Sequence, residues 1–294
     1  MSEATAAQGA ASTPEVSVAQ ERRERLGQLL SSPTFLTGAV IVVFWAVCAI
    51  FGHALVPYDP LADDMLNTLL PPSREHFFGT DQLGRDVFSR VITGSRDILT
   101  VAPLATLLGT LGGTVLGLAM GYSRGLVDEV LSRVVDALLA LPTVIVALLA
   151  LVALGTSKLT VVLVIAFGFM PIIARTVRAA VLAERELDYV AAAKLRLEGP
   201  FHIMFAEILP NVAPPIMVET TVRLGYAIFT VATLSFIGFG IQPPSPDWGL
   251  SISANYGLIG GGYWWTVLFD GLAIASLVIG VNLIADGIES VADG

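Results

Sequence analysis

The chain has 294 residues, of which 54% are hydrophobic and 14% are charged, and its mean hydropathy is +0.76. A soluble domain of average composition carries roughly 25% charged residues, so the composition excludes an ordinary soluble protein and indicates a membrane protein. The net charge of -9 argues against a nucleic-acid partner, because phosphate binding needs clustered lysine and arginine. Cys48 is the single cysteine, so an intrachain disulfide is excluded.

The first 32 residues are expected to form a cytoplasmic tail. Residues 1–20 are small, polar and acidic, which predicts disorder, and they lack the basic start and apolar core of a signal peptide. Residues 21–30, ERRERLGQLL, predict a short basic amphipathic helix that can lie on a membrane surface.

Six stretches are long and apolar enough to cross a bilayer, which takes about 20 mostly apolar residues. The first lies within residues 33–57 and follows the cap-and-proline helix start Ser31-Ser32-Pro33. Pro142 and Pro171 are expected to kink the third and fourth spans. The predicted spans are residues 35–56, 98–122, 130–154, 159–182, 208–237 and 264–285. We therefore predict an all-α membrane protein with six transmembrane helices.

The distribution of lysine and arginine among the loops predicts their sides of the membrane. If the N-terminus is inside, the outer segments hold Arg74, Arg85, Arg90, Arg96 and Lys158. The inner segments then hold a larger set, Arg22, Arg23, Arg25, Arg124, Arg133, Arg175, Arg178, Arg185, Lys194 and Arg196. Six spans return the chain to the same side, so both termini are predicted to be cytoplasmic.

Residues 58–96 form the predicted extracytoplasmic loop between the first two spans. The stretch GTDQLGRDVFSRVITGSRD, residues 79–97, predicts an interfacial helix on the outer face. Its apolar stripe consists of Leu83, Val87 and Val91 with the adjacent Phe88 and Ile92. Its charged residues are expected to pair along the opposite, solvated side: Asp81, Arg85, Asp86 and Arg90.

Glycines recur every four residues along the second span, at Gly109, Gly113, Gly117 and Gly121. Glycines at this spacing share one helix face and let another helix backbone approach closely in lipid. We interpret them as a packing surface of a compact bundle within residues 97–294.

The sequence contains no recognisable motif for nucleotide binding, metal binding or serine catalysis. There is no G-x-x-x-x-G-K-[ST] sequence, so the chain is not expected to bind nucleotide phosphates by itself. The three histidines are scattered, without metal-ligand spacing. Ser95 has no histidine in an apolar span that could serve as its general base, which argues against an intramembrane serine protease. These patterns favour a transporter subunit or a structural membrane protein over an enzyme, with no cofactor or metal in this chain.

Two opposite charges lie deep in the fifth span. Glu219 and Arg223 stand four residues apart in the favourable order for helix pairing, after Pro214-Pro215, which should kink the helix. Ionisable residues inside a membrane mark functional sites by default. Two interpretations have equal weight, a polar patch on a substrate path and a self-satisfied pair that stabilises the bundle. Met217, Glu219 and Arg223 are the candidate residues of that path.

A charged, helix-prone insert, LDYVAAAKLRLEGPFHIMFAEILPN, separates the fourth and fifth spans at residues 187–211. Its Tyr189–Ala193 stretch and its terminal Ile208-Leu209-Pro210-Asn211 resemble the cytoplasmic loop of bacterial ABC importer permeases. Residues 78–90, 235–250 and 281–294 also resemble signatures of the dipeptide/oligopeptide/nickel permease family, C-type subunit. The resemblance covers about residues 34–294.

The resemblance implies that residues 187–207 form coupling helices that dock into an ATPase subunit. The sequence departs from the family pattern twice, since Ala191 replaces its glutamate and Leu197 occupies its glycine position. Gly199 lies two residues later, so the turn could be shifted. Val190, Ala193 and Leu197 are expected to line one side of the first helix. The candidate coupling residues are Tyr189, Val190, Ala191, Ala192, Ala193, Lys194, Leu197 and Gly199.

The resemblance further implies a type I ABC importer permease fold in a bacterial inner membrane. The expected partners are a second related permease subunit, two ATPase subunits that bind ATP and magnesium, an extracytoplasmic substrate-binding protein and membrane lipid. A short peptide is the expected substrate, and nickel or another small solute is the alternative within the family. Outside it, the alternatives are a secondary transporter driven by protons through Glu219 and a membrane scaffold that does not transport.

Overall fold

A computed structural model describes the backbone of residues 27–292 and the side chains up to residue 290. Within this range the backbone is helical, and β-pairing is limited to one isolated antiparallel bridge between Thr80 and Asp86. The prediction of an all-α protein is confirmed. The disorder predicted for residues 1–20 and most of the amphipathic helix predicted for residues 21–30 lie outside the described residues.

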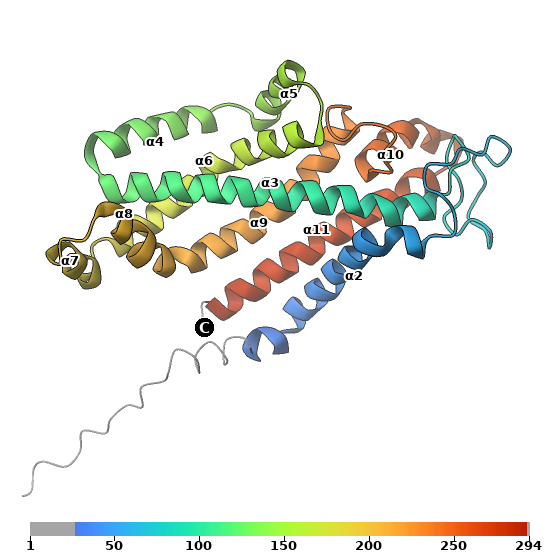
Figure 1. Cartoon of the computed structure of the whole chain (residues 1–294). Helices are drawn as coiled ribbons and strands as arrows, with labels where there is room; N and C mark the ends of the chain where they lie inside the picture. The colour runs from blue at the N-terminus through green and yellow to red at the C-terminus, as the bar shows by residue number, and fades with distance from the viewer. Residues whose placement is uncertain (1–26, 293–294) are drawn as a thin grey trace, which may run out of the picture.

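Long helices run side by side between two ends of the bundle (Figure 1). They are α2 (Pro33–Leu55), α3 (Val87–Ser123), α6 (Lys158–Glu184), α9 (Leu209–Phe236) and α11 (Trp265–Ala292). Five helices of the described chain are long and apolar enough to cross a membrane, or six if one bent helix pair counts as a span.

Helix α2 starts as the sequence predicts. Ser32 is its N-cap, and its hydroxyl accepts a hydrogen bond of 3.4 Å from the Phe35 amide, with Pro33 in the first turn. The helix then packs against α11 at very short range, because a Cβ built on Gly38 would lie 2.5 Å from the Gly280 carbonyl oxygen. The first span is thereby attached to the last one.

The prediction of a separate interfacial helix over residues 79–97 is wrong, because residues 87–97 are the first part of α3. Residues 79–86 form a loop in which Gly79 and Gly84 have φ of 77° and 75°, and such left-handed residues interrupt a helix. The helix starts only after Asp86, whose carboxylate accepts a 2.8 Å hydrogen bond from the Ser89 amide. From there α3 continues without a break through the second predicted span.

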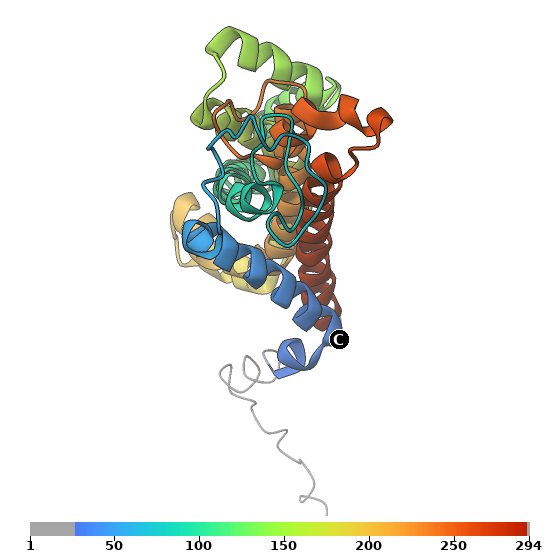
Figure 2. The same ribbon diagram turned by 90° about the vertical axis from the view of Figure 1, so that its right-hand side faces the viewer.

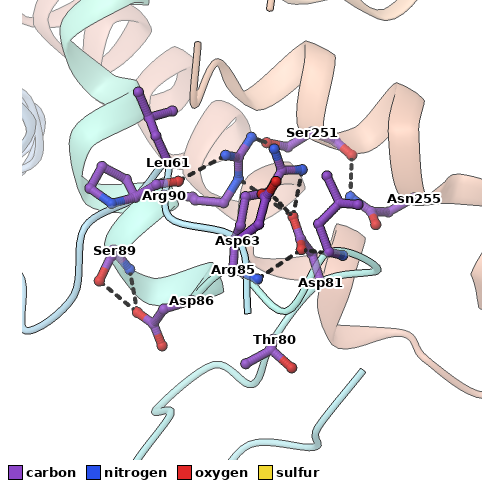
Figure 3. Close-up of polar contacts among 12 residues, drawn as sticks. Leu61, Asp63, Thr80, Asp81, Arg85, Asp86, Ser89, Arg90, Ser251 and Asn255 are labelled. Atoms are coloured by element: carbon purple, nitrogen blue, oxygen red, sulfur yellow. Dashed lines mark hydrogen bonds and ion pairs between the residues drawn. The ribbon is translucent and has the colours of Figure 1, made fainter. Parts of the chain in front are cut away.

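The charges of this region are buried, so the solvated face expected for them is also wrong (Figure 3). Arg90 is 4% exposed and donates hydrogen bonds to the Pro60 carbonyl at 3.0 Å and to Ser251 Oγ at 3.1 Å. Asp81 is 1% exposed and pairs with Arg85 at 2.8 Å. The network joins the segment after α2 to α3 and to α10 (Trp248–Asn255), a short helix that was not predicted from the sequence.

The third predicted span, residues 130–154, is not one helix. The chain forms α4 (Gly125–Leu139) and α5 (Thr143–Leu154), which meet at an angle of 87°. Pro142 lies at this break, as expected from its missing amide hydrogen and fixed φ. Pro171, in contrast, lies inside the continuous helix α6.

The glycine face of α3 packs against α6, and the predicted close packing is confirmed. A Cβ at Gly113 would lie 2.7 Å from Ile173 Cβ, and one at Gly117 would lie 2.5 Å from Val177 Cβ. Gly121 faces Val181 in the same way. The two helices therefore form a tightly packed core pair on which the other elements are arranged.

The two ends of the bundle carry different short elements. One end holds α7 (Asp188–Leu195) and α8 (Pro200–His202), beside the turn between α3 and α4 (Figure 1). The opposite end holds the loop of residues 56–86, α10 and the 3-10 turn Tyr256–Gly261 (Figure 2).

Candidate functional site

The first candidate site is the segment between α6 and α9. Helix α7 is followed by a turn over residues 196–199, by α8 and by a π-helical turn, Ile203–Ile208, which continues directly into α9. Pro210 lies just after the π-turn, and the Leu209 amide bonds back five residues to the Met204 carbonyl. The segment thus consists of a short helix, a turn, and a second helical part from Pro200 that is continuous with the fifth predicted span.

Leu197 determines the turn that ends α7. It has φ of 60°, in the left-handed region that favours glycine, whereas Gly199 has an ordinary φ of -69°. The Leu197 amide bonds to the Lys194 carbonyl and the Glu198 amide to the Ala193 carbonyl, the two bonds of a Schellman motif. The turn therefore stays at the glycine position of the family pattern, and the possible shift to Gly199 does not occur.

Helix α7 exposes a different face from the one predicted. Val190 and Ala193 are 0% exposed, because they pack into the core of the bundle. Val190, Ala193 and Leu197 were expected to form one contact surface, but only Leu197 is exposed, so the prediction is wrong for Val190 and Ala193. The side available to a partner carries Ala191, Ala192, Leu195 and Leu197, and Leu195 is 84% exposed.

Several side chains fasten this segment to the end of α3. Arg185 donates hydrogen bonds to the carbonyls of Gly121 and Tyr122, at 3.0 and 2.6 Å, and so satisfies the last turn of α3. The Lys194 ammonium lies 5.9 Å from the centre of the Tyr122 ring, within cation–π range. Tyr189 donates a hydrogen bond to Glu184 at 2.7 Å. Burial and this carboxylate raise the pKa of Tyr189 to about 12, so the phenol stays a donor.

The turn after α7 is also tied to the start of the fifth span. Arg196 pairs with Glu198 at 2.6 Å and with Glu207 at 3.0 Å. The hydrogen bond from Arg196 lowers the pKa of Glu198, which keeps this carboxylate charged. Lys194 therefore connects α7 to the end of α3 at Tyr122, and Arg196 connects the turn after α7 to the π-turn at Glu207.

The second candidate site is the ion pair on α9. Arg223 Nε lies 2.6 Å from Glu219 Oε1, and the two side chains are 18% and 17% exposed. The predicted pairing along the helix is confirmed. Pro214 and Pro215 lie inside α9, which continues through them. Met217 is 58% exposed, and the structure does not bring it to the pair.

A cavity of about 220 Å³ lies beside this pair, between α9, α6 and the start of α5. Among its lining residues, only Arg223 was predicted from the sequence. The sequence could also have predicted Tyr226, Thr230 and Thr233. They follow Glu219 and Arg223 at spacings of three and four residues, which places them on the same helix face. The lining comprises Thr143, Val144, Ile165, Gly168, Phe169, Ile172, Arg223, Tyr226, Phe229, Thr230, Thr233 and Leu234.

Residues 113–292 match the protein family described as "Binding-protein-dependent transport system inner membrane component". The chain belongs to this family. Residues 23–72 match a second family, the N-terminal TM domain of oligopeptide transport permease C. The chain is therefore an ABC transport permease and a multi-pass protein of the inner membrane. This membership favours a subunit of a binding-protein-dependent system over a proton-driven secondary transporter or a scaffold.

Curated permeases of similar length resemble this one over most of their sequence. The chain is 37% identical to the probable D,D-dipeptide transport permease DdpC of Escherichia coli, over 90% of this chain and 89% of that protein. It is also 37% identical to the dipeptide permease DppC of Alkalihalophilus pseudofirmus, over 92% and 89% of the two chains. The di/tripeptide permease DppC of Pseudomonas aeruginosa is 33% identical, over 88% and 87%.

A solved structure supports the fold. A chain of the MetNI methionine ABC transporter, in an inward-facing conformation, superposes with a TM-score of 0.57 at 20% identity. The match covers 69% of this permease and 96% of that chain. The type I importer permease fold is thereby supported, and at this identity the likeness extends to the fold alone.

Proposed function

We propose that this chain is a transmembrane subunit of an ATP-driven importer of short peptides. The observation that carries the proposal is the 33–37% identity, over about nine-tenths of the chain, to permeases named for dipeptide, D,D-dipeptide and di/tripeptide transport. These names favour a peptide over nickel as the substrate. Uptake of a radiolabelled dipeptide, with nickel uptake measured in parallel, into liposomes that contain the whole transporter tests this choice.

The proposed transporter contains further subunits. A second related permease subunit completes the membrane channel, and two ATPase subunits bind ATP and magnesium. An extracytoplasmic binding protein delivers the peptide. The family description supports the requirement for a binding protein. Purification of the native complex, followed by mass spectrometry of its subunits, identifies these partners.

In this arrangement, α7 is the contact with an ATPase subunit. Its exposed side combines the small residues Ala191 and Ala192 with Leu195 and Leu197, and a few well-packed apolar anchors dominate binding energy in such contacts. Helix α7 packs against the π-turn that leads into the fifth span, and Lys194 contacts Tyr122 at the end of α3, so a displacement of α7 moves the bundle as packed helices. Glu219 and Arg223 then lie along the substrate path.

The substitution Ala192→Trp tests the coupling role. An indole on the small-residue side of α7 would overfill the contact, so we expect peptide uptake to be lost and ATP hydrolysis to become independent of the loaded binding protein. Both activities are measured in liposomes. Ala137→Trp, at an exposed alanine of α4, is the control and should keep both. Normal uptake with normal stimulated hydrolysis in Ala192→Trp would show that α7 is not the coupling element.

We also propose that the α7 end of the bundle faces the cytoplasm, together with both termini. Arg124 lies in the turn between α3 and α4, and Arg185, Lys194 and Arg196 lie beside or on α7, so basic residues gather at this end, as the positive-inside rule expects. Single cysteines in a Cys48→Ser background test the orientation. In intact cells, a membrane-impermeant thiol reagent should label Ala254→Cys on α10 and leave Ala192→Cys unlabelled. The reverse pattern would contradict the proposed orientation.

A further inference from the structure

One face of α9 is only partly covered by the rest of the described chain. It follows the spacing Glu219, Arg223, Tyr226, Thr230 and Thr233, and combines an ion pair, an aromatic ring and hydroxyl groups. Charged residues in a membrane span face protein or a water-filled path, since exposure to hydrocarbon is costly. The polar part of this face therefore borders a protein-lined or water-filled space.

Arg223 has unused hydrogen-bonding capacity toward that space. Its Nε donates to Glu219, and within residues 27–292 its two terminal amino groups donate no further hydrogen bond. Its Cζ atom lies 5.1 Å from the centre of the Tyr226 ring, so the planar group is held against an aromatic face. The guanidinium is fixed at one edge, with its other donors free.

The cavity next to Arg223 has the composition of a small-ligand site. Arg223 is the one charged residue in its lining; Phe169, Ile172 and Phe229 supply apolar walls, and Thr143, Thr230 and Thr233 supply hydroxyl groups. Ligand pockets combine mostly apolar walls with a few polar groups that fix orientation. A guanidinium with two free amino groups matches a planar carboxylate through two parallel hydrogen bonds.

We propose that Arg223 binds the C-terminal carboxylate of a peptide as it passes through this cavity. The inference rests on the proposed function, since it requires peptide substrates. Glu219 holds the guanidinium in place and offsets its charge, which keeps the carboxylate weakly bound. Weak binding suits a transport path, because a permeating solute must leave a site as readily as it enters.

Protection of a cysteine placed in the cavity tests the proposal without the binding protein. Thr233→Cys is introduced into a Cys48→Ser background, and the rate of maleimide labelling is measured on the purified complex. The dipeptide Ala-Ala should slow labelling, and its C-terminal amide should not. In Arg223→Gln, the concentration of Ala-Ala that gives half protection should rise about tenfold or more, as expected for a lost hydrogen bond to a charged group. Arg223→Lys should give an intermediate value, because lysine keeps the charge and loses the planar fork.

Thr230→Cys serves as a second reporter, and Arg133→Gln, an exposed arginine of α4, is the control that should leave protection unchanged. Equal protection by the dipeptide and its amide, no protection by either, or unaltered protection in Arg223→Gln would each overturn the proposal. Peptide uptake by the wild-type complex is measured separately. Absence of that uptake refutes the proposed function, whereas normal uptake without carboxylate-dependent protection refutes only the role of Arg223.

Discussion

A single residue, Leu197, decides where helix α7 ends. A non-glycine residue in the left-handed region is strained by roughly 1–2 kcal/mol, since its Cβ approaches the following carbonyl oxygen. The Leu197 side chain is 90% exposed and contributes little packing in return. The strain is tolerated because both Schellman hydrogen bonds and the Arg196 ion pairs fix the turn.

Leu197→Gly should stabilise the turn by about 0.5–1 kcal/mol, as relief of the left-handed strain exceeds the extra flexibility of glycine in the unfolded chain. Hydrogen exchange of the α7 amides should become slower. Leu195→Gly is the matched control, since Leu195 is similarly exposed but helical, and it should destabilise α7 by about 0.5–1 kcal/mol. Faster exchange in Leu197→Gly would mean that the side chain, and not the backbone, stabilises the turn.

Among the elements, the α3–α6 pair depends on a row of glycines. Without side chains, the α3 backbone approaches α6 to distances that any Cβ would violate, and dispersion contacts then hold the two helices together in lipid. Gly112, one position off this row, faces only the flexible end of Met170, whose Cε would lie 2.6 Å from an added Cβ. The same helix therefore contains one glycine that packing requires and another that it does not.

Gly117→Ala should destabilise the protein by about 1–3 kcal/mol, since the new methyl group overlaps Val177 Cβ and the Ala174 carbonyl. Gly112→Ala should be neutral or stabilising by up to about 1 kcal/mol, because Met170 can move and alanine favours the helix. Loss of helicity in detergent titrations of the two purified variants measures the difference. Equal effects of the two substitutions would contradict the role assigned to the glycine row.

In the whole molecule, Arg90 joins segments that are far apart in sequence. Its guanidinium contacts the loop after α2, at Pro60, and α10, at Ser251, and Asp81 lies 3.8 Å from it. A buried charge is costly unless it is paired and hydrogen-bonded. Arg90 meets all its partners only when the loop after α2, α3 and α10 are packed in this one arrangement. The network (Figure 3) therefore holds together the loop after α2, α3 and α10, at the end of the bundle opposite α7 (Figure 1).

Arg90→Met should destabilise the chain by about 1–3 kcal/mol, because it leaves the Pro60 carbonyl and the Ser251 hydroxyl without their buried donor, whereas Asp81 keeps its pair with Arg85. Arg96→Met, at an exposed arginine of the same helix, should change stability by about 0.5 kcal/mol or less. The stability of each variant is measured by heating it in the presence of a maleimide, since Cys48 is buried and reacts only when the bundle opens. Comparable labelling temperatures for the two variants would show that the network contributes little.

Features that depend on neighbours in sequence could be predicted. The Ser32 cap, the Glu219–Arg223 pair, the glycine row of α3 and the break at Pro142 follow from spacings within one or two helical turns. The start of α3 was missed because Gly79 and Gly84 interrupt a stretch whose apolar stripe resembles a helix. The burial of Arg90 was missed because one of its partners, Ser251, lies 161 residues away in the sequence.

Sequence alone determined that this protein is a helical membrane protein, because apolar run length and local periodicity indicate which segments can cross a bilayer, and its motifs carried the resemblance to a permease. Only the tertiary structure decided which side of α7 is free, which charges are buried and which residues join Arg223 around a cavity. These properties depend on which helix faces touch, and packing selects those faces from contacts between distant segments. The same physical rule, that a buried polar group needs a partner, then explains why both terminal amino groups of Arg90 are hydrogen-bonded and why Arg223, whose terminal amino groups have no partner in the described chain, borders open space.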